Sequence, residues 1–201
     1  MTKSPEFNLR PATPADIPQI LQFIRDLATY EREPDAVVAT EADLLRDGFS
    51  EARRFDCIIA DWTHSGLSTP AGFVLYFYNY STWRGHTGIY VEDIYVGPEY
   101  RGKGIGKALL TRVAAIAVEQ GCPRLEWSVL DWNQPSIDFY HQVGAVMKSE
   151  WKGMQISGDA LSALATQASV LPDGPTAPDL QEQSGHFVTC LPASPARGGQ
   201  S

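Results

Sequence analysis

The chain has 201 residues, 43% of them hydrophobic, with 24 acidic against 16 basic side chains and a formal net charge of −8. This length is sufficient for one domain with its own buried core, and the composition is typical of a soluble globular protein. The acidic balance argues against nucleic acid as the main partner and is compatible with a cationic substrate.

Neither a targeting segment nor a membrane span is visible. Residues Met1–Arg10 lack an apolar core of signal-peptide length, and no apolar run is long enough to cross a bilayer. The three cysteines and four scattered histidines show no metal-ligand spacing. We therefore expect a cytoplasmic protein with free thiols, no metal and no membrane partner.

The N-terminal segment predicts a strand followed by an amphipathic helix. Phe7–Arg10 is the strand, and Thr13, Pro14 and Asp16 form a helix start, with Thr13 as N-cap and Asp16 reaching back to it. Apolar residues then recur at helical spacing as far as Tyr30, so this helix buries one face.

A second short helix is expected from Glu41 to Arg46, capped by Thr40 and stopped by Gly48. Strands dominate the middle of the chain, because aromatic and β-branched residues are frequent there. The expected strands are Phe55–Ala60, Gly72–Tyr80 and Thr87–Val96, with a hairpin loop at Asp61–Ala71.

The second half alternates helices and strands. The expected elements are a helix at Ile105–Glu119 ended by Gly121, a strand at Leu125–Leu130, a helix at Gln134–Val143 capped by Asn133, and weaker strands at Ala145–Lys148 and Gly153–Ser157. This order predicts an α/β domain of three layers, with a mixed, mostly antiparallel central sheet flanked by helices. The domain spans residues 1–165. Residues 166–201, rich in Pro, Gly and Ser, are expected to be a disordered tail, with recruitment of a partner as the alternative.

The most informative segment lies between the strand that ends at Val96 and the helix from Ile105. Glycines at such a junction let backbone N–H groups approach an anion, and the helix start adds its positive dipole end. The expected contacts of a phosphate-bearing ligand are Arg101, Gly102, Lys103, Gly104, Ile105, Gly106 and Lys107. The segment contains neither a P-loop nor a dinucleotide fingerprint.

This Arg-x-x-Gly-x-Gly pattern resembles the acetyl-CoA pyrophosphate loop of the Gcn5-related N-acetyltransferases, the GNAT family. Leu27-Ala28-Thr29-Tyr30-Glu31, Val91-Glu92-Asp93-Ile94-Tyr95-Val96 and the segment from Asp131 to Tyr140 are similar to its diamine acetyltransferase branch, which includes spermidine/spermine and thialysine acetyltransferases. The resemblance covers roughly residues 7–165. Glu150–Leu161 looks closer to microbial relatives, which leaves the identity of the amine open.

The resemblance implies how acetyl-CoA would bind. The backbone of Ile94, Tyr95 and Val96 would hold pantetheine like an added strand, with the Ile94 amide or its neighbour as oxyanion donor. Asn133 and Ser136 would lie near the pantetheine, and Tyr140 on the same helical face would give its proton to the CoA sulfur. Members of this branch usually form homodimers, so we expect a homodimer.

Acetyl transfer requires that the amine lose its proton, because an alkylammonium with a pKa of about 10 has no lone pair. Glu92 is the candidate base: strand alternation places it on the face opposite Val91 and Asp93, where desolvation would raise its pKa. A structural ion pair is the alternative for Glu92. Asp93 either pairs with a second amine or fixes a basic side chain.

The remaining substrate candidates are Tyr30 and Glu31, from the resemblance, and Trp83 and Trp151 as aromatic walls for an alkylammonium chain. The expected function is acetyl-CoA-dependent N-acetylation of a small polyamine- or diamine-like substrate by direct attack in a ternary complex. Thialysine, lysine-like amino acids or peptide amines are alternative acceptors. A non-catalytic acyl-CoA sensor is the alternative from another class, and it would need neither Glu92 nor Tyr140.

Overall fold

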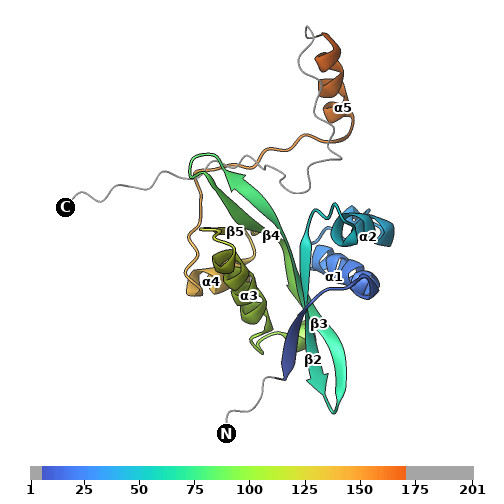
Figure 1. Cartoon of the computed structure of the whole chain (residues 1–201), viewed down its shortest axis with the longest axis vertical. Coiled ribbons are helices and arrows are strands. Elements are labelled where there is room, and N and C mark those ends of the chain that lie inside the picture. The colour runs from blue at the N-terminus through green and yellow to red at the C-terminus, as the bar shows by residue number, and fades with distance from the viewer. Residues whose placement is uncertain (1–5, 171–201) are drawn as a thin grey trace, which may run out of the picture. The chain divides into compact units, whose positions relative to one another are not determined.

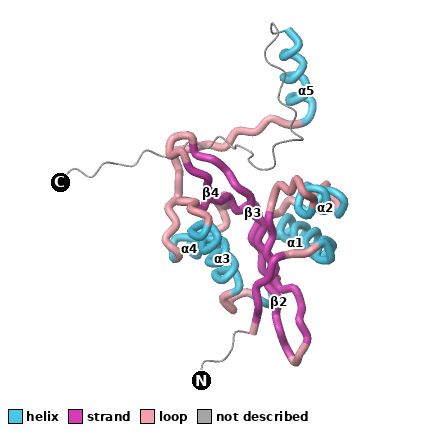
Figure 2. Tube along the Cα trace, in the orientation of Figure 1, coloured by secondary structure: helices cyan, strands magenta, loops and turns pink. Residues whose placement is uncertain are grey.

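The computed structural model describes residues 6–170, and five strands of this part form one mixed sheet in the order β1-β2-β3-β4-β5 (Figures 1 and 2). The strands are β1 (Phe7–Pro11), β2 (Asp56–His64), β3 (Leu67–Ser81), β4 (His86–Val96) and β5 (Leu125–Trp127). The first four pair antiparallel, and β5 adds parallel to β4. The predicted mixed, mostly antiparallel sheet is confirmed.

Helices cover both faces of this sheet. The helices α1 (Ile17–Tyr30) and α2 (Glu41–Phe49) lie on one face and α3 (Ile105–Glu119) on the other (Figure 1). These elements belong to one compact unit that reaches Ser128. The described residues from Val129 to Val170 belong to a second unit, which contains α4 (Gln134–Gln142) and α5 (Gly158–Thr166). Short 3₁₀ turns occupy Pro14–Asp16, Pro34–Ala36, Pro98–Tyr100 and Gln167–Val170.

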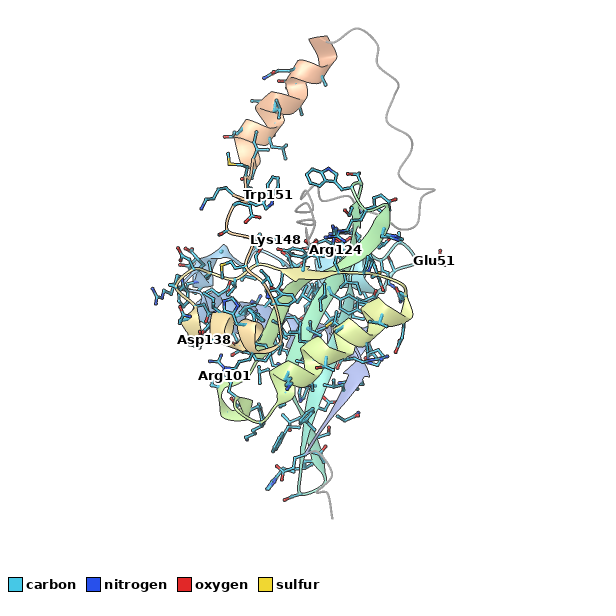
Figure 3. The ribbon with its side chains drawn as sticks, turned by 90° about the vertical axis from the view of Figure 1, so that its left-hand side faces the viewer. Glu51, Arg101, Arg124, Asp138, Lys148 and Trp151 are labelled. Atoms are coloured by element: carbon cyan, nitrogen blue, oxygen red, sulfur yellow. The ribbon has the colours of Figure 1, made fainter. Side chains whose placement is uncertain are left out.

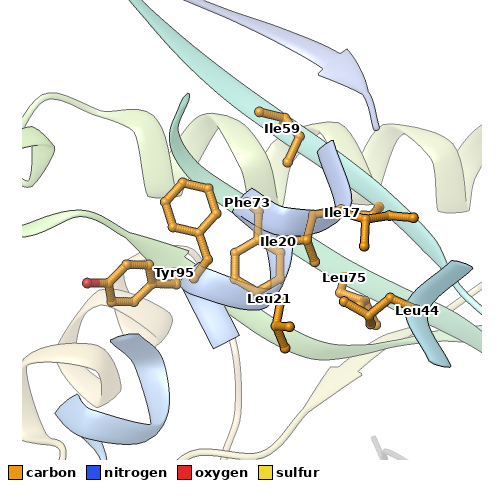
Figure 4. Close-up of a cluster of buried hydrophobic side chains, with 10 residues drawn as sticks. Ile17, Ile20, Leu21, Leu44, Ile59, Phe73, Leu75 and Tyr95 are labelled. Atoms are coloured by element: carbon orange, nitrogen blue, oxygen red, sulfur yellow. The ribbon is translucent and has the colours of Figure 1, made fainter. Parts of the chain in front are cut away.

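The side chains between α1 and the sheet make a continuous apolar cluster (Figure 4). Ile20 and Phe73 are fully buried in it, and the ring of Phe23 stacks on Phe73 with centroids 5.5 Å apart. Burying a side chain of this size contributes about 1.5–3 kcal/mol. Tyr95 of β4 closes the same cluster, so the end of β4 is fixed against α1.

Local signals explain where the first helices begin and end. Thr13 and Asp16 form the predicted capping box, and Thr40 with Asp43 forms another ahead of α2. Gly48, however, does not stop α2, which continues to Phe49. A Cβ on Gly48 would lie 2.5 Å from the Phe55 ring, so glycine is required there for packing.

The hairpin expected between β2 and β3 forms, but the prediction that its loop spans Asp61–Ala71 is wrong. β2 and β3 continue as paired strands to His64 and Leu67, joined by the two-residue turn Ser65–Gly66. Both turn residues have positive φ, 51° and 79°, which is the requirement of a tight primed hairpin turn. This turn fixes which residues of β2 and β3 face each other, and the pairing therefore continues through polar residues up to the turn.

A buried polar network supports the short pairing of β5 with β4. Arg124 donates from Nη2 to Oδ1 of Asn79 at 2.8 Å, and its Nε lies 2.7 Å from Oε2 of Glu126. Asn79 also donates to Glu126 at 3.1 Å. The network lies over Gly88, where a Cβ would come within 2.7 Å of Arg124 Nε, so only glycine leaves room for it.

The C-terminal predictions differ most from the structure. β5 ends at Trp127, three residues earlier than expected, and neither Ala145–Lys148 nor Gly153–Ser157 forms a strand. A strand needs a neighbour for its backbone groups, and these stretches pair with no strand in the described part of the chain. Gly158–Thr166 is an unpredicted helix, consistent with its content of Ala and Leu. Residues 171–201 of the predicted tail lie outside the described residues.

An ion-pair network fixes β1 to its neighbours. Arg10 donates two hydrogen bonds of 2.8 Å to Asp16 and one of 2.6 Å to Asp61 of β2. The guanidinium of Arg10 lowers the pKa of Asp16 from 3.8 to about 2, against the opposing effect of burial, and hydrogen bonds from Thr13 add to the lowering.

We expect Asp16→Asn to lower the free energy of unfolding at pH 7 by about 1–3 kcal/mol, because a partly buried guanidinium loses a charged partner. The folded-state pKa lies below the unfolded value, so this contribution is complete above about pH 4 and is lost as the pH falls towards 2. Urea titrations at several pH values measure it. The control Glu119→Gln, in an exposed pair on α3, should change stability by less than about 0.5 kcal/mol. Equal losses in both variants would contradict the assignment.

Candidate active site

The parallel pairing of β4 and β5 stops after three residues. Ile89, Tyr90 and Val91 face Leu125, Glu126 and Trp127, whereas β4 continues to Val96 with β3 as its partner. Among residues 6–170 no strand pairs with the other edge of β4 from residue 92 to 96. That edge carries backbone N–H and C=O groups in strand geometry, and an extended ligand can pair with them.

A β-bulge interrupts β4 at the same point. Leu75 of β3 pairs with Asp93 and the next residue, Tyr76, pairs with Val91, so Glu92 has no partner residue on β3. Bulges of this kind are frequent next to active sites, where they redirect a side chain. The regular alternation predicted from the sequence therefore does not hold at Glu92.

The expected burial of Glu92 is wrong, and the neighbouring acid is the desolvated one. Glu92 is exposed, whereas Asp93 and Glu31, at the end of α1, are both half-buried. Burial raises the pKa of Asp93 from 3.8 to about 6, and the charges of Glu92 and Glu31 add to this. Burial also raises the pKa of Glu31. The structure thus brings these three acids together beside the open edge of β4.

The turn that leads from β4 into α3 depends on glycine at two positions. Gly102 has φ of 73° and Gly104, the N-cap of α3, has φ of 85°. A Cβ on either residue would meet nothing within 4 Å, so their backbone conformation, rather than crowding, requires glycine. The first N–H groups of α3 have no partners within the helix, and together with the dipole they favour an anion.

The two cations of this turn lie against aromatic rings. The guanidinium of Arg101 is 5.0 Å from the centroid of Tyr30, and Nζ of Lys103 is 4.4 Å from the centroid of Trp62. Figure 3 shows Arg101 in the turn ahead of α3. Sequence reasoning missed these contacts, because the aromatic partners come from α1 and β2, far away along the chain.

Of the remaining predicted residues, Trp83 belongs to the first unit and the others belong to the second. Trp83 lies in the exposed turn before β4, and the seven residues from His86 to Glu92 span roughly 20 Å along the strand. Trp151 is an exposed residue of the second unit. In that unit Asn133 caps α4 by accepting from the Ser136 N–H, as predicted, and Tyr140 lies in the last turn of α4. Asn133, Ser136 and Tyr140 thus share one helix and its cap, as the sequence indicated.

The described residues also bear on metals and membranes. Across residues 6–170 no group of three or more His, Cys, Asp or Glu side chains is arranged to hold a metal ion. In the same range, every helix is too short or too polar to span a membrane.

Comparisons with known proteins agree with this geometry. The acetyltransferase (GNAT) family model matches residues 19–145. The chain is 40% identical to a thialysine N-epsilon-acetyltransferase of Bos taurus over 168 residues, covering 78% of this chain and 96% of that protein. It is 36% identical to an L-ornithine N5-acetyltransferase of Arabidopsis thaliana, covering 78% and 86% of the two chains. It is also 40% identical to the human spermidine/spermine N(1)-acetyltransferase-like protein 1, covering 75% of this chain and 22% of that protein.

Solved structures show the same fold. An integron cassette protein from the mobile metagenome of V. cholerae superposes with a TM-score of 0.64 at 25% identity, covering 80% of this chain and 98% of its own. An aminoglycoside acetyltransferase from a soil metagenome superposes with a TM-score of 0.62 at 15% identity, covering 76% and 96%. The chain belongs to the GNAT family of acetyltransferases and is an N-acetyltransferase, a family that uses acetyl-CoA as acetyl donor.

We expect Gly104→Ala to weaken binding of acetyl-CoA by roughly tenfold, because its Cβ would stand in the open space at the turn that we propose as the diphosphate site. The positive φ should also cost about 1–2 kcal/mol of stability. Gly66→Ala is the matched control: its φ is 79°, and nothing lies within 4 Å of its added Cβ, but it lies in the β2–β3 turn. It should cost similar stability and leave the dissociation constant unchanged. Calorimetry and thermal unfolding measure both, and equal effects on binding would contradict the assignment.

Proposed function

We propose that this enzyme transfers acetyl from acetyl-CoA directly to a primary amine of a small cationic molecule, a diamine or polyamine, in a ternary complex. One observation carries the proposal. The open edge of β4 beyond Val91 leads directly into the glycine turn and the start of α3, so an extended thioester arm and a diphosphate have adjoining sites. Three carboxylates beside that edge supply the charge that a cationic amine requires.

On the donor side, the backbone of Ile94, Tyr95 and Val96 pairs with pantetheine, and the Ile94 amide stabilises the oxyanion of the tetrahedral intermediate. The diphosphate binds at the glycine turn. The residues proposed for this contact are Arg101, Gly102, Lys103, Gly104, Ile105, Gly106 and Lys107. The φ values of Gly102 and Gly104 and the open space around them support this assignment.

Glu92 is the proposed proton acceptor of the attacking amine, directly or through water. Its exposure at the bulge supports the proposal, because a base must reach a substrate that arrives from solvent. Glu92 takes one proton from the ammonium, and the resulting neutral amine attacks the thioester carbon. The C–S bond then breaks, and the second proton that nitrogen loses balances the proton that the departing thiolate receives. Tyr140 of α4 is the proposed proton donor to the departing thiolate, and Asn133 and Ser136 are the proposed pantetheine contacts from the same helix.

Asp93 and Glu31 are the proposed partners of the ammonium groups of the acceptor. A second cationic amine beside a desolvated carboxylate would compensate the cost of keeping that acid ionised. The roles of Trp83 and Trp151 as amine contacts stay predictions. Among acceptors, thialysine, lysine-like amino acids and peptide amines remain the alternatives, since relatives bear the names of thialysine and ornithine acetyltransferases.

We also propose that the enzyme is a cytoplasmic homodimer. Large apolar side chains are exposed in the second unit, including Val146, Met154 and Leu164, and association with a second copy would remove such side chains from water. Sedimentation equilibrium of the full chain tests this, and a species of 22.1 kDa at every concentration would contradict it. The free, buried thiols of Cys57 and Cys122 are compatible with a reducing compartment. Fractionation of cells that produce the full chain tests the location.

The function itself is tested by the release of free thiol from acetyl-CoA in the presence of candidate amines. The panel contains putrescine, spermidine, thialysine, ornithine, lysine and a short peptide with a free N-terminus. We expect turnover to be fastest with a diamine or polyamine. Turnover confined to the amino acids would favour the alternative acceptors, and CoA binding without thiol release for any amine would contradict the proposal.

We expect Glu92→Gln to lower kcat by about 10²–10⁴-fold, because the amide cannot take the proton of the ammonium. The dissociation constant for acetyl-CoA should change by less than about twofold, since the donor contacts are proposed to be backbone groups and the glycine turn. Steady-state kinetics and calorimetry measure the two effects. Unchanged turnover would remove Glu92 from the mechanism.

For Tyr140→Phe, the loss of turnover should be greatest under conditions in which departure of the thiolate limits the rate.

We expect Asp93→Asn to have opposite effects on stability and activity. The pKa of Asp93 in the folded protein, about 6, lies above its unfolded value, so its ionisation lowers stability as the pH rises through 6. The variant should therefore be more stable than the wild type at pH 8, by on the order of 2 kcal/mol, and equally stable near pH 4. Its kcat/KM for the diamine should fall by roughly tenfold. In the wild type, protonation of Asp93 should lower kcat/KM below pH 6, and the variant should not show this decrease.

The matched control is Asp35→Asn, an exposed acid in the turn after α1. It should alter neither the stability nor the pH profile of kcat/KM. Thermal unfolding and initial rates between pH 4 and pH 8.5 measure both. A loss of stability at pH 8 in Asp93→Asn would show that the acid is held by a favourable structural pair instead.

A further inference from the structure

Arg101 is held by groups from two elements outside its own turn. Its guanidinium carbon lies 5.0 Å from the ring centroid of Tyr30, at the end of α1, and 5.6 Å from that of Tyr95 on β4. Both distances are within the range of cation–π attraction. Its Nε also donates to the carbonyl oxygen of Val96 at 3.0 Å. The side chain is therefore fixed at its charged end, although it is exposed.

Lys103 shows the same arrangement with different partners. Its Nζ lies 4.4 Å from the ring of Trp62 and 5.4 Å from that of Tyr100, and these two rings are themselves 5.9 Å apart. Trp62 comes from β2, and Tyr100 from the 3₁₀ turn ahead of the glycines. Each of the two cations beside Gly102 thus has a pair of aromatic rings as its support.

Such support has a consequence for anion binding. A free arginine or lysine side chain samples many rotamers, and ordering it on a ligand costs affinity. A cation that already lies against fixed rings has lost this freedom before the ligand arrives. The guanidinium donates from Nε to Val96 and also hydrogen-bonds the Tyr95 side chain, so it can meet a phosphate only through its other N–H groups and in a limited set of orientations.

We propose that Tyr30 is a positioning residue for the acetyl donor: its ring holds the guanidinium of Arg101 at the glycine turn, where Arg101 meets the diphosphate of acetyl-CoA. This inference rests on the proposed use of that turn for acetyl-CoA. It assigns Tyr30 to the donor side of the site, whereas the sequence resemblance placed Tyr30 with the amine. Trp62 has the corresponding role for Lys103.

The test is a double-mutant cycle read out as the dissociation constant of CoA by calorimetry. Tyr30→Leu should raise this constant about two- to fivefold, the fold-change that corresponds to an exposed cation–π contact. In an Arg101→Gln background the same substitution should have no effect, because the group it positions is absent. Tyr30→Phe keeps the aromatic ring, so its affinity for CoA should stay close to that of the wild type.

Further measurements separate this role from a general structural one. The KM for the amine should stay within about twofold in Tyr30→Leu. Tyr80→Leu, which removes a tyrosine near the β3–β4 turn, is the control and should leave CoA binding unchanged. Trp62→Leu provides a second variant, which should also lower the affinity for CoA. In a Lys103→Gln background the same substitution should leave the affinity unchanged.

Several outcomes would overturn the inference. These are unchanged or tighter CoA binding in Tyr30→Leu, an equal loss in both backgrounds, or a rise in KM for the amine alone. The last result would instead place Tyr30 at the amine. If the wild-type chain does not bind CoA, the proposed function itself is contradicted. If the wild type binds CoA and Tyr30→Leu binds it equally well, only the inference about Tyr30 is contradicted.

Discussion

The site depends on one constraint, the loss of a neighbouring strand for β4 beyond Val91. β5 pairs with β4 for only three residues, and β4 then continues to Val96 with β3 alone as its strand partner in the described part of the chain. Backbone polar groups in strand geometry need partners, so the open edge favours a ligand that can act as a short strand. The end of this strand also leads into the turn before α3, so the proposed sites of the thioester arm and the diphosphate lie on consecutive residues of one chain segment.

The bulge at the same point divides two adjacent acids between different environments. Glu92 gains exposure because no residue of β3 opposes it, and Asp93 remains in the ladder and loses water. Two neighbouring carboxylates with different solvation can perform different tasks, one exchanging protons and the other holding a cation. The burial of Asp93 costs the free enzyme stability at neutral pH, and an acceptor ammonium would offset part of that cost. Such destabilised groups are common at functional sites.

Short-range signals in the sequence predicted the local structure well. The capping box of Thr13 and Asp16, the limits of α3 and the cap of α4 by Asn133 depend on residues within one helical turn of each other, and all are confirmed. Predictions that needed a distant partner were less reliable. The hairpin arms in residues 61–71 were missed because pairing extends polar strands, and the strands expected at 145–148 and 153–157 do not form because no strand pairs with them among residues 6–170.

The candidate site shows the same division. The main-chain part of the donor site, a strand edge followed by glycines of positive φ, is contiguous in the sequence and could be predicted from it. The side-chain part is not contiguous, because Arg101 depends on Tyr30, about 70 residues earlier, and the desolvation of Asp93 depends on a bulge that no residue pattern specified. A glycine turn alone would offer amides to many phosphates. Arg101 and Lys103 lie against rings of α1 and β2, so in the proposed site the packing of the sheet and its helix, rather than the turn motif, determines where the charge of the ligand is met.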